Sequence, residues 1–472
     1  MTRRAASVKH PLAVAPTMSG RAGCPPKSSP PVAAAPTLTR GRADPRIVPS
    51  MKAPATAPRL PFRRGPAEFC LGVEADHEAV YQNLLHVFHG PDRDSFLAAL
   101  ADPQYRPEQR LLAKVDGRVA SHVHLTDRFV RYGRVELPMN GVMWVGTLPE
   151  YRGMGLAQNL VRLADARARE AGVVLQALTT GMPQFYRPLG WGACGRQAVG
   201  MVLSRNLPSI GDGLVETKGG PWHVRPWRQV EIVGLMSLYD QQFGRTTGSV
   251  VRTEEYWRWI IGRKYAHVIW VACQGDQVRG YAFVKDHKVL EIASDPAYPN
   301  ALKALMGRIR AEALERAYPE VILFAPEDHP AMEVLRGVGG KLIDQKDMEN
   351  ASSMYHIPDV GGFLQRILPE LSARVAASEV EAPQELGLTV GDRRWLLHVE
   401  AGGGRIEPDK LGRRHLTLSP PALVRLLMGQ TGVDRAIGQD GAEASTATAL
   451  DVARVLFPVR PVWRSPLDSA TA

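Results

Sequence analysis

A glycine-rich loop between an apolar run and an amphipathic segment carries residues whose types and spacing could bind a phosphate. Residues 142–145 form an apolar run typical of a strand, and Pro149 ends it. The loop at residues 152–157 reads Arg-Gly-Met-Gly-Leu-Ala, and apolar residues then recur at helical spacing. Glycines at a strand-to-helix junction let backbone N–H groups converge, and the helix start adds a partial positive charge. The pattern therefore predicts a pyrophosphate site at the start of a helix.

The spacing within this loop narrows the kind of phosphate site. It matches neither GxGxxG nor GxxxxGK[ST], which argues against the two common nucleotide-binding motifs. Its Arg-x-x-Gly-x-Ala spacing, directly after a predicted strand, resembles the acetyl-CoA loop of the GNAT acyltransferase family. Residues 177–192 contain a Tyr-x-x-x-Gly-aromatic turn from Tyr186 to Trp191, and they resemble the next strand and short helix of that family. A glycine turn before an ordinary surface helix is the alternative interpretation.

The resemblance implies a cofactor site and a catalytic residue. The strand edge would offer backbone groups to the pantetheine arm, and the loop with the first helical turn would hold the pyrophosphate. Tyr186 matches the general acid of the family. The implied cofactor-binding residues are Val145, Gly146, Thr147, Arg152, Gly153, Met154, Gly155, Leu156, Ala157, Gln158, Gly181 and Met182.

The implied reaction is acetyl transfer from acetyl-CoA, a co-substrate, to a primary amine such as an aminoglycoside-like polyamine or a protein lysine. A tyrosine hydroxyl can protonate the leaving thiolate or the tetrahedral intermediate. The amine must first lose a proton, because a free lysine-like amine titrates near ~10.4. In the family the terminal carboxylate of the chain, on a final aromatic residue, is the base. This sequence ends in Ala472, which leaves the carboxylate of Ala472, Asp468 or a water molecule as candidates.

Other residues near these motifs are expected to be structural more often than chemical. His122 and His124 share one strand face and could line the site, but histidines on strands are more often structural. Trp144 is expected in the core rather than as a substrate platform, and Cys194 as a small buried residue. An acidic pocket would favour polycationic acceptors, and its candidates are Glu74, Asp76 and Glu150.

A non-catalytic protein that senses acyl-CoA or holds a lipid is the alternative function. The intact loop together with Tyr186 argues against this alternative. The departure from the family pattern at the end of the sequence argues for it.

The positive charge of the chain is concentrated near its start. The 472 residues carry a net charge of +10, but residues 1–66 hold twelve of the 58 Lys and Arg residues and one of the 48 acidic residues. The remainder is near neutral, so its bulk charge predicts no nucleic-acid partner. Residues 1–66 also hold thirteen of the 37 prolines, and a disordered, solvated tail is expected. A basic arm, a transit peptide or translation from Met51 are further interpretations of this segment.

The cysteines and the hydropathy indicate the compartment. Cys24, Cys70, Cys194 and Cys273 are far apart and form no Cys-x-x-Cys pair. This spacing argues against a disulfide framework and a zinc site, so no metal is expected, and it fits the reducing cytoplasm. Apolar runs are all well short of 18 residues, so no membrane association is expected.

The order of predicted elements indicates an α/β (α+β) chain with tandem GNAT folds. Residues 67–214 resemble a catalytic GNAT domain with a mixed sheet splayed at the cofactor strand. Residues 215–352 repeat this order without a glycine at residues 294–300, which predicts a degenerate GNAT-like domain without a cofactor site. Residues 353–468 resemble a sterol-carrier-like domain. Together they resemble the enhanced intracellular survival family of N-acetyltransferases, which implies a homo-oligomer, a hexamer by analogy.

Overall fold

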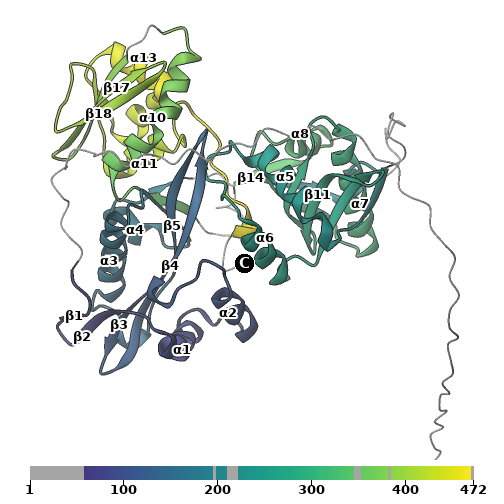
Figure 1. The fold of residues 1–472 in the computed structure, drawn as a ribbon, viewed down its shortest axis with the longest axis horizontal. Helices are drawn as coiled ribbons and strands as arrows, with labels where there is room; N and C mark the ends of the chain where they lie inside the picture. Colours follow the sequence, from purple (N-terminus) through teal and green to yellow (C-terminus); the bar gives the residue numbers. More distant parts are fainter. Residues whose placement is uncertain (1–57, 195–197, 210–221, 345–351, 381–383, 469–472) are drawn as a thin grey trace, which may run out of the picture. The chain divides into compact units, whose positions relative to one another are not determined.

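The computed structural model describes residues 58–194, 198–209, 222–344, 352–380 and 384–468. The described residues all belong to one compact unit, residues 51–472. Within them, three mixed or antiparallel β-sheets carry helices on their faces (Figure 1). The mixed α/β architecture expected from the sequence is confirmed.

The predicted disordered tail lies mostly outside the described residues, but its last residues form a strand. β1 (Phe62–Arg64) pairs with β2 (Ala67–Leu71), and the ring of Phe62 stacks on Phe69 with centroids 5.0 Å apart. The prediction of disorder is therefore wrong for residues 62–64. Backbone pairing and an aromatic contact offset the entropy of ordering them.

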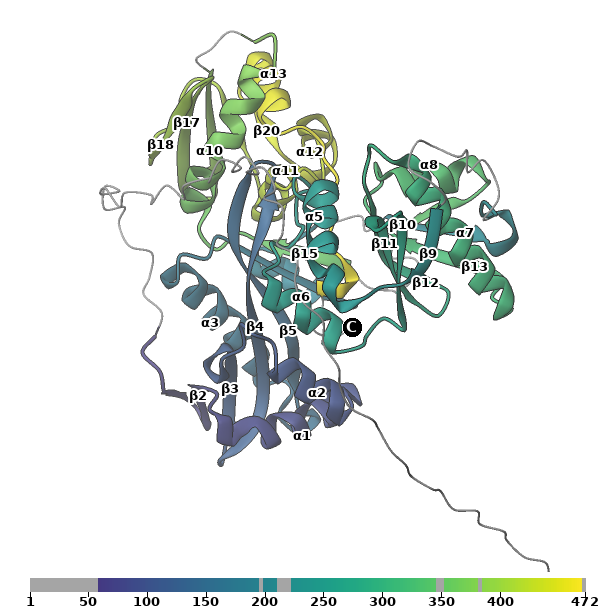
Figure 2. The same ribbon diagram turned by 45° about the vertical axis from the view of Figure 1, so that its right-hand side comes forward.

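The first sheet has the strand order β1-β2-β3-β4-β5-β6-β15-β7. Helix α3 packs on one face and α1 with α2 on the other (Figures 1 and 2). Val123 of β4 joins the apolar cluster with α3, whereas Val119 joins the cluster with α1. The bounds are β3 (Arg110–Val115), β4 (Arg118–Tyr132), β5 (Val135–Thr147), β6 (Leu175–Thr180), β7 (Gly192–Ala193), α1 (His77–Phe88), α2 (Arg93–Leu100), α3 (Leu156–Glu170) and α4 (Pro183–Tyr186).

Strands β5 and β6 separate along their length. They run parallel and pair only where Met139–Gly141 faces Leu175–Ala177. Residues 142–147 of β5 have no pairing with β6, so their backbone groups on that side are free of sheet hydrogen bonds. We call the space between residues 142–147 of β5 and strand β6 the gap.

A β-bulge interrupts the pairing of β4 with β5 beside this gap. The register shifts between His122 and His124, and Trp144 on the opposite strand has φ +54°. A positive φ is uncommon for a bulky residue, so the backbone of β5 is strained at this point.

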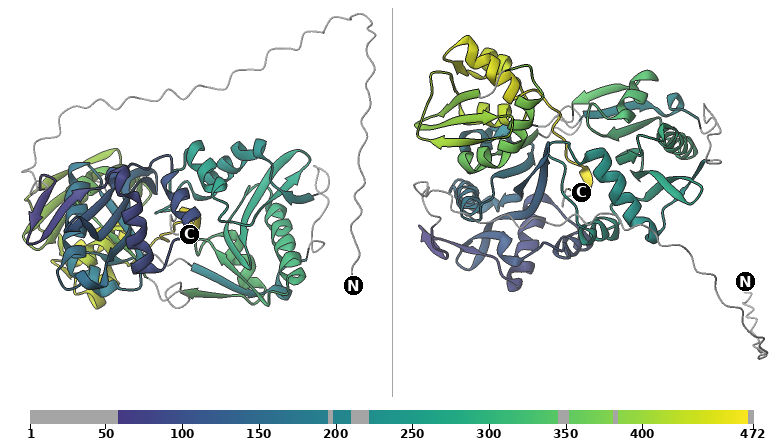
Figure 3. Two further views of the ribbon diagram at one scale, coloured as in Figure 1. Left: turned by 90° about the horizontal axis from the view of Figure 1, so that it is seen from below. Right: turned by 45° about the horizontal axis from the view of Figure 1, so that its top comes forward.

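The second sheet has the order β14-β8-β13-β12-β11-β10-β9. Helix α5 covers one face and α7 the other, because alternate residues of β10 and β11 contact one helix or the other (Figure 3). The bounds are β8 (Ala198–Leu203), β9 (Trp222–Pro226), β10 (Val268–Gln274), β11 (Gln277–Lys285), β12 (Lys288–Ser294), β13 (Glu320–Phe324), β14 (Lys341–Asp344), α5 (Ile232–Phe243), α6 (Glu254–Gly262), α7 (Pro299–Glu315) and α8 (Pro330–Gly337).

Two strands cross the boundaries expected between the first two domains. β8, which precedes residue 214, pairs with β13 and β14 of the second sheet. β15 (Ser352–His356), which follows the second sheet in the chain, pairs with β6 and β7 of the first sheet. The first two sheets are therefore not divided at residues 214 and 352, because backbone pairing rather than chain order decides which sheet a strand completes.

The third sheet has the order β18-β17-β16-β19-β20. β16 and β17 are joined by a two-residue hairpin turn at Gly391 and Asp392, with φ +58° at Gly391. Ser419 caps α11, since its side chain accepts from the N–H of Ala422. The bounds are β16 (Gln384–Val390), β17 (Arg393–Glu400), β18 (Gly403–Pro408), β19 (His415–Thr417), β20 (Glu443–Ala444), α10 (Val360–Ala376), α11 (Pro420–Leu427), α12 (Val433–Asp440) and α13 (Ala447–Leu456).

Candidate functional site

The glycine loop turns directly into helix α3. Gly153 and Gly155 have φ values of +81° and +71°, which L side chains rarely adopt. A Cβ added at Gly153 would meet no atom within 4 Å, so the space beside the loop is open. The loop therefore combines a backbone that requires glycine with room for a ligand to approach.

The N-terminus of α3 lacks a side-chain cap. Gly155 occupies the N-cap position, and the first turn contains no acidic residue. Helices α2, α6, α11 and α13 instead have N-terminal caps from Asp92, Thr253, Ser419 and Thr446. The first-turn N–H groups of α3, those of Leu156, Ala157 and Gln158, are thus left for an anion at the positive end of the helix dipole.

The free edge of β5 lies in the same part of the sheet. A Cβ on Gly146 would come 2.8 Å from Cε2 of Phe88 in α1, so this position has no room for a side chain. The hydroxyl of Ser121 donates to the carbonyl of Gly146 at 2.9 Å and lies 2.9 Å from the hydroxyl of Thr147. Val145 packs into the apolar cluster that contains α3. These contacts hold the edge in place while its other side faces the gap.

Tyr186 is brought to the same cluster by the short helix α4. Its side chain packs with Leu156 of α3 and Val142 of β5, and its ring meets Phe185 and Trp191 edge-on at 4.8 and 5.7 Å. Burial raises the pKa of Tyr186 above its usual range. Within the described residues nothing hydrogen-bonds to its hydroxyl. The tyrosine is therefore protonated and has a proton to donate.

His356, which is distant in the sequence, packs against Trp191, the residue whose ring contacts Tyr186. His356 of β15 stacks on Trp191 with ring centroids 5.4 Å apart, and its Nε2 lies 2.9 Å from the carboxylate of Asp165 in α3. This support could not be found from the local pattern, because β15 joins the first sheet from beyond the second one.

The remaining residues of the expected cofactor site lie at the surface beside the loop and α4. Met154 and Met182 are 41% and 59% exposed, and Arg152 and Gly181 are exposed as well. The N–H of Met182 donates to the hydroxyl of Thr180 at 3.0 Å. The structure thus places these side chains at the open end of the gap rather than in the core.

Two residues, Ala472 and Asp468, are candidates for the base that accepts the proton of the amine. Ala472 lies outside the described residues. Asp468 is buried, and its carboxylate accepts from Nε and Nη2 of Arg252 at 2.9 and 3.0 Å. Arg252 also binds Glu291, through Nη1 at 2.9 Å and Nη2 at 2.6 Å. Asp468 is therefore committed to a buried ion pair, which argues against it as the base.

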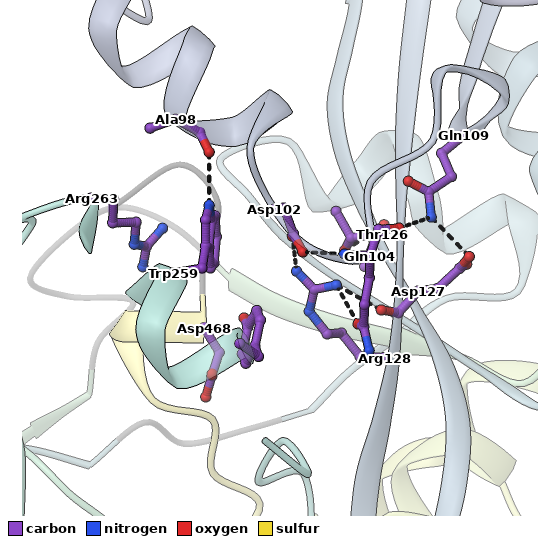
Figure 4. A network of polar contacts seen from close by, with 12 residues as sticks. Ala98, Asp102, Gln104, Gln109, Thr126, Asp127, Arg128, Trp259, Arg263 and Asp468 are labelled. Atoms are coloured by element: carbon purple, nitrogen blue, oxygen red, sulfur yellow. Dashed lines mark hydrogen bonds and ion pairs between the residues drawn. The ribbon is translucent and has the colours of Figure 1, made fainter. Parts of the chain in front are cut away.

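Two of the three acidic candidates for a polycation pocket are engaged in ion pairs. Asp76 forms an ion pair with Lys114 at 2.7 Å, and Glu150 forms one with Arg118, also at 2.7 Å. The buried face of β4 instead presents an ion pair of Arg128 with Asp102, close to Trp259 of α6, whose Nε1 donates to the carbonyl of Ala98 at 2.8 Å (Figure 4).

His122 and His124 are both buried on the face of β4 that packs against α1 and α2. The Nε2 atom of His122 lies 3.1 Å from Nη1 of Arg110, and its Nδ1 lies 3.2 Å from the carbonyl oxygen of Trp144. Because arginine only donates, Nε2 is the acceptor and Nδ1 carries the proton that binds the Trp144 carbonyl. Sequence patterns single out the two histidines but not Arg110.

Three further observations concern a cysteine, metal ligands and membrane-spanning helices. Cys194 is buried, as expected, and burial raises the pKa of its thiol. The described residues hold no group of three His, Cys, Asp or Glu side chains suited to a metal ion. None of the helices in the described ranges has the length and hydropathy needed to cross a membrane.

A mixed sheet that splays beside a glycine loop, with the loop leading into a helix, is the fold of GNAT acetyltransferases. Residues 72–194 match the family model described as an acetyltransferase (GNAT) domain. A comparison with the curated proteins finds no match.

Solved structures share the fold over most of the chain. The GCN5-related N-acetyltransferase from Anabaena variabilis is 17% identical with a TM-score of 0.67, and the match covers 84% of this chain and 99% of that one. A probable N-acyltransferase from Enterococcus faecalis is 15% identical with a TM-score of 0.68 over the same shares of the two chains. Eis1 from Mycobacterium abscessus is 18% identical with a TM-score of 0.59, covering 83% of this chain and 98% of that one. The shared fold thus extends well beyond residues 72–194.

Proposed function

We propose that the protein is an N-acetyltransferase that transfers the acetyl group of acetyl-CoA to a primary amine, such as an aminoglycoside-like polyamine or a protein lysine. The observation that carries this proposal is the meeting of three features in one apolar cluster: the free edge of β5, the uncapped start of α3 and the side chain of Tyr186. The GNAT match and the fold of N-acetyltransferases support it.

The residues present fit acetyl-CoA. The open space beside Gly153 and the uncapped N–H groups of α3 suit a pyrophosphate. Val145, Gly146 and Thr147 lie on the strand edge that a pantetheine amide would pair with. When bound, acetyl-CoA supplies a thioester that an amine can attack.

In this proposal the chain orients the thioester and moves one proton. The edge of β5 and the loop fix the cofactor, and the gap admits the amine from the face of α1 and α2. Tyr186 donates its proton as the thiolate leaves, a role that its raised pKa permits because the hydroxyl stays protonated at neutral pH. We propose the carboxylate of Ala472, or a water molecule, as the base that accepts the proton of the amine.

The proposed organisation keeps the order of domains that the sequence predicts, with the catalytic site within residues 67–214. In the second sheet, β12 and β13 also pair at only two positions, but residues 294–300 offer no glycine for a phosphate. We therefore propose that residues 215–352 have no cofactor site. The likeness to Eis1 along most of the chain supports membership of the enhanced intracellular survival family. We propose residues 353–468 as its sterol-carrier-like domain and a homo-oligomer, a hexamer by analogy with that family, as its assembly.

The test of the proposed function is acetyl transfer by the full chain. Release of the free thiol of coenzyme A should depend on an added primary amine, and mass spectrometry should find that amine 42 Da heavier, the mass an acetyl group adds to an amine in this reaction class. Tight binding of acetyl-CoA without transfer to any amine of a broad panel would instead support the non-catalytic alternative. Light scattering measures the number of chains in the assembly, independently of the activity.

A further inference from the structure

Arg110 differs from the other buried arginines of the described residues in having no carboxylate partner. Arg128, Arg252 and Arg374 each form an ion pair with a carboxylate: Asp102, Glu291 and Glu370 respectively, and Arg252 binds Asp468 as well. Arg110 is 1% exposed, and no carboxylate of the described residues forms an ion pair with it. Burying an unpaired charge is costly, so a protein retains one where something else supplies the opposite charge.

The recorded neighbours of Arg110 are uncharged: the rings of Phe96 and Tyr105, whose centroids lie 5.2 and 5.4 Å from its Cζ, and neutral polar groups. Its Nε donates to the hydroxyl of Tyr105 at 2.9 Å, and that hydroxyl lies 2.7 Å from Nε2 of His77. Its Nη1 donates to His122 at 3.1 Å. The third nitrogen, Nη2, has no hydrogen bond within the described part of the chain. We call Arg110, Tyr105, His77, His122 and His124 the Arg110 cluster.

His124 is the second unusual member of this cluster. It pairs directly with Arg110 across β3 and β4, so the two side chains lie side by side on one face of the sheet. Both of its ring nitrogens are buried and neither has a hydrogen-bond partner in the described residues. A side chain with two unsatisfied polar atoms beside an unpaired guanidinium indicates a site where a polar group is missing.

The net charge of the cluster is positive. Burial lowers the pKa of His77, and it lowers those of His122 and His124 well below their ordinary value, with Arg110 as the second cause in each case. The three histidines are therefore neutral near pH 7, and Arg110 alone is charged. A single anionic oxygen group would complete this charge balance, whereas a polycation would be repelled.

The Arg110 cluster adjoins the gap in which the acyl group is proposed to lie. His122 connects them, because it binds Arg110 on one side and the carbonyl of Trp144 on the other. Trp144 directly precedes the cofactor edge of β5, and its indole meets Phe88 of α1 edge-on at 5.4 Å. The cluster therefore lies one strand away from β5, on the face from which the amine would enter.

We propose that the Arg110 cluster binds an anionic oxygen group, a carboxylate or a phosphate, of the amine that is acetylated. The acceptor would then be a primary amine that also carries a negative charge, such as an amino acid or a phosphorylated amino sugar, rather than a polycationic amine. Nη2 of Arg110 and the ring of His124 would donate to this group. The proposal rests on the proposed acetyl transfer for the identity of the ligand.

The test compares amines that differ in the anionic group alone. Acetylation of tyrosine and tyramine isolates the carboxylate, and acetylation of glucosamine 6-phosphate and glucosamine isolates the phosphate. A charge-assisted pair predicts at least about tenfold higher kcat/KM for the charged member of one pair. Arg110→Met should abolish this preference, so that kcat/KM for the charged member falls about tenfold relative to the uncharged member. Arg118→Met, on the exposed start of β4, is the matched control and should keep the preference.

A binding measurement separates this proposal from the proposed function. Calorimetry with N-acetyltyrosine, the product analogue, should show binding to the native chain and at least about tenfold weaker binding to Arg110→Met. If Arg110→Met does not fold, Arg110→Lys should keep the preference for the charged amine, because the charge remains. Equal kcat/KM for both members of both pairs, or a preference that survives in Arg110→Met, would overturn the anion site and leave acetyl transfer intact. Binding of N-acetyltyrosine that needs Arg110, without transfer to any amine, would support the site and overturn the proposed function.

Discussion

Arg252 binds Asp468 through two hydrogen bonds, Nε to Oδ1 at 2.9 Å and Nη2 to Oδ2 at 3.0 Å, and both side chains are fully buried. The same guanidinium binds Glu291 of β12, whose Oε1 also accepts from the hydroxyl of Tyr281 at 2.9 Å. The segment that ends at Asp468 is therefore fixed to the second sheet. Trp463 adds to this attachment by stacking on Phe243 with centroids 4.4 Å apart.

Loss of the ion pairs that Arg252 forms with Asp468 and Glu291 should strongly destabilise the fold. Arg252→Met removes the guanidinium that pairs with two buried carboxylates, and we expect the free energy of unfolding to fall by about 3–5 kcal/mol. Urea denaturation measures it. Arg258→Met is the matched control, because its partner Glu254 is exposed, and it should cost less than about 1 kcal/mol. Similar losses for the two variants would show that the buried cluster does not stabilise the fold as described.

Gly153→Ala tests the phosphate loop. The new Cβ would meet no atom of the chain, so the change should cost only the strain of a positive φ, about 1–2 kcal/mol. It would fill space beside the proposed pyrophosphate, and we expect acetyl-CoA to bind at least about tenfold more weakly by calorimetry, a loss of about 1.4 kcal/mol. Gly172→Ala carries the same strain, with φ +69°, at the other end of α3, and should leave the affinity unchanged. Equal effects of the two variants would place the phosphate elsewhere.

Tyr186→Phe tests the general acid. The ring packing remains while the donated proton is lost, so kcat should fall about 10²–10⁴-fold and the affinity for acetyl-CoA should stay within about twofold. Steady-state kinetics and calorimetry measure the two quantities. Tyr151→Phe, in the same apolar cluster, removes a hydroxyl without a proposed role and should leave both unchanged. A fully active Tyr186→Phe enzyme would assign the proton to another group.

Local sequence patterns predicted the elements that present the site. The glycine loop and α3 follow from residues close together in the chain. The partners of these elements could not be predicted, because they depend on contacts distant in sequence. β15 joins the first sheet across about 160 residues from β7, and Asp468 binds Arg252 from 216 residues away. The Arg110 cluster likewise comes together only once β3, β4 and α1 are assembled. Only then is it evident that the buried guanidinium of Arg110 has no carboxylate of the described residues beside it.

Stability should depend on pH through the buried histidines. Folding lowers the pKa of His122 and His124 below about 6.5, so the unfolded chain binds more protons as the pH falls below that value. The free energy of unfolding should be highest above about pH 6.5. Below that pH it should decrease by up to about 1.4 kcal/mol per pH unit for each histidine.

Urea denaturation at pH 7.5 and 5.5 measures this loss. His124→Leu should reduce it, because one group that takes up a proton on unfolding is removed. His86→Leu is the control, since His86 is exposed in α1, and should leave the loss as in the native chain. A loss that is the same in all three proteins would show that His124 is not the group whose protonation opposes folding.

A crystal structure of the full chain with coenzyme A tests the central claim most directly. The account predicts the pyrophosphate on the N–H groups at the start of α3, the pantetheine arm along residues 145–147 of β5, and the sulfur within hydrogen-bonding reach of the Tyr186 hydroxyl, about 3.3 Å for a sulfur partner. Coenzyme A bound away from the gap between β5 and β6, or a sulfur remote from Tyr186, would contradict it.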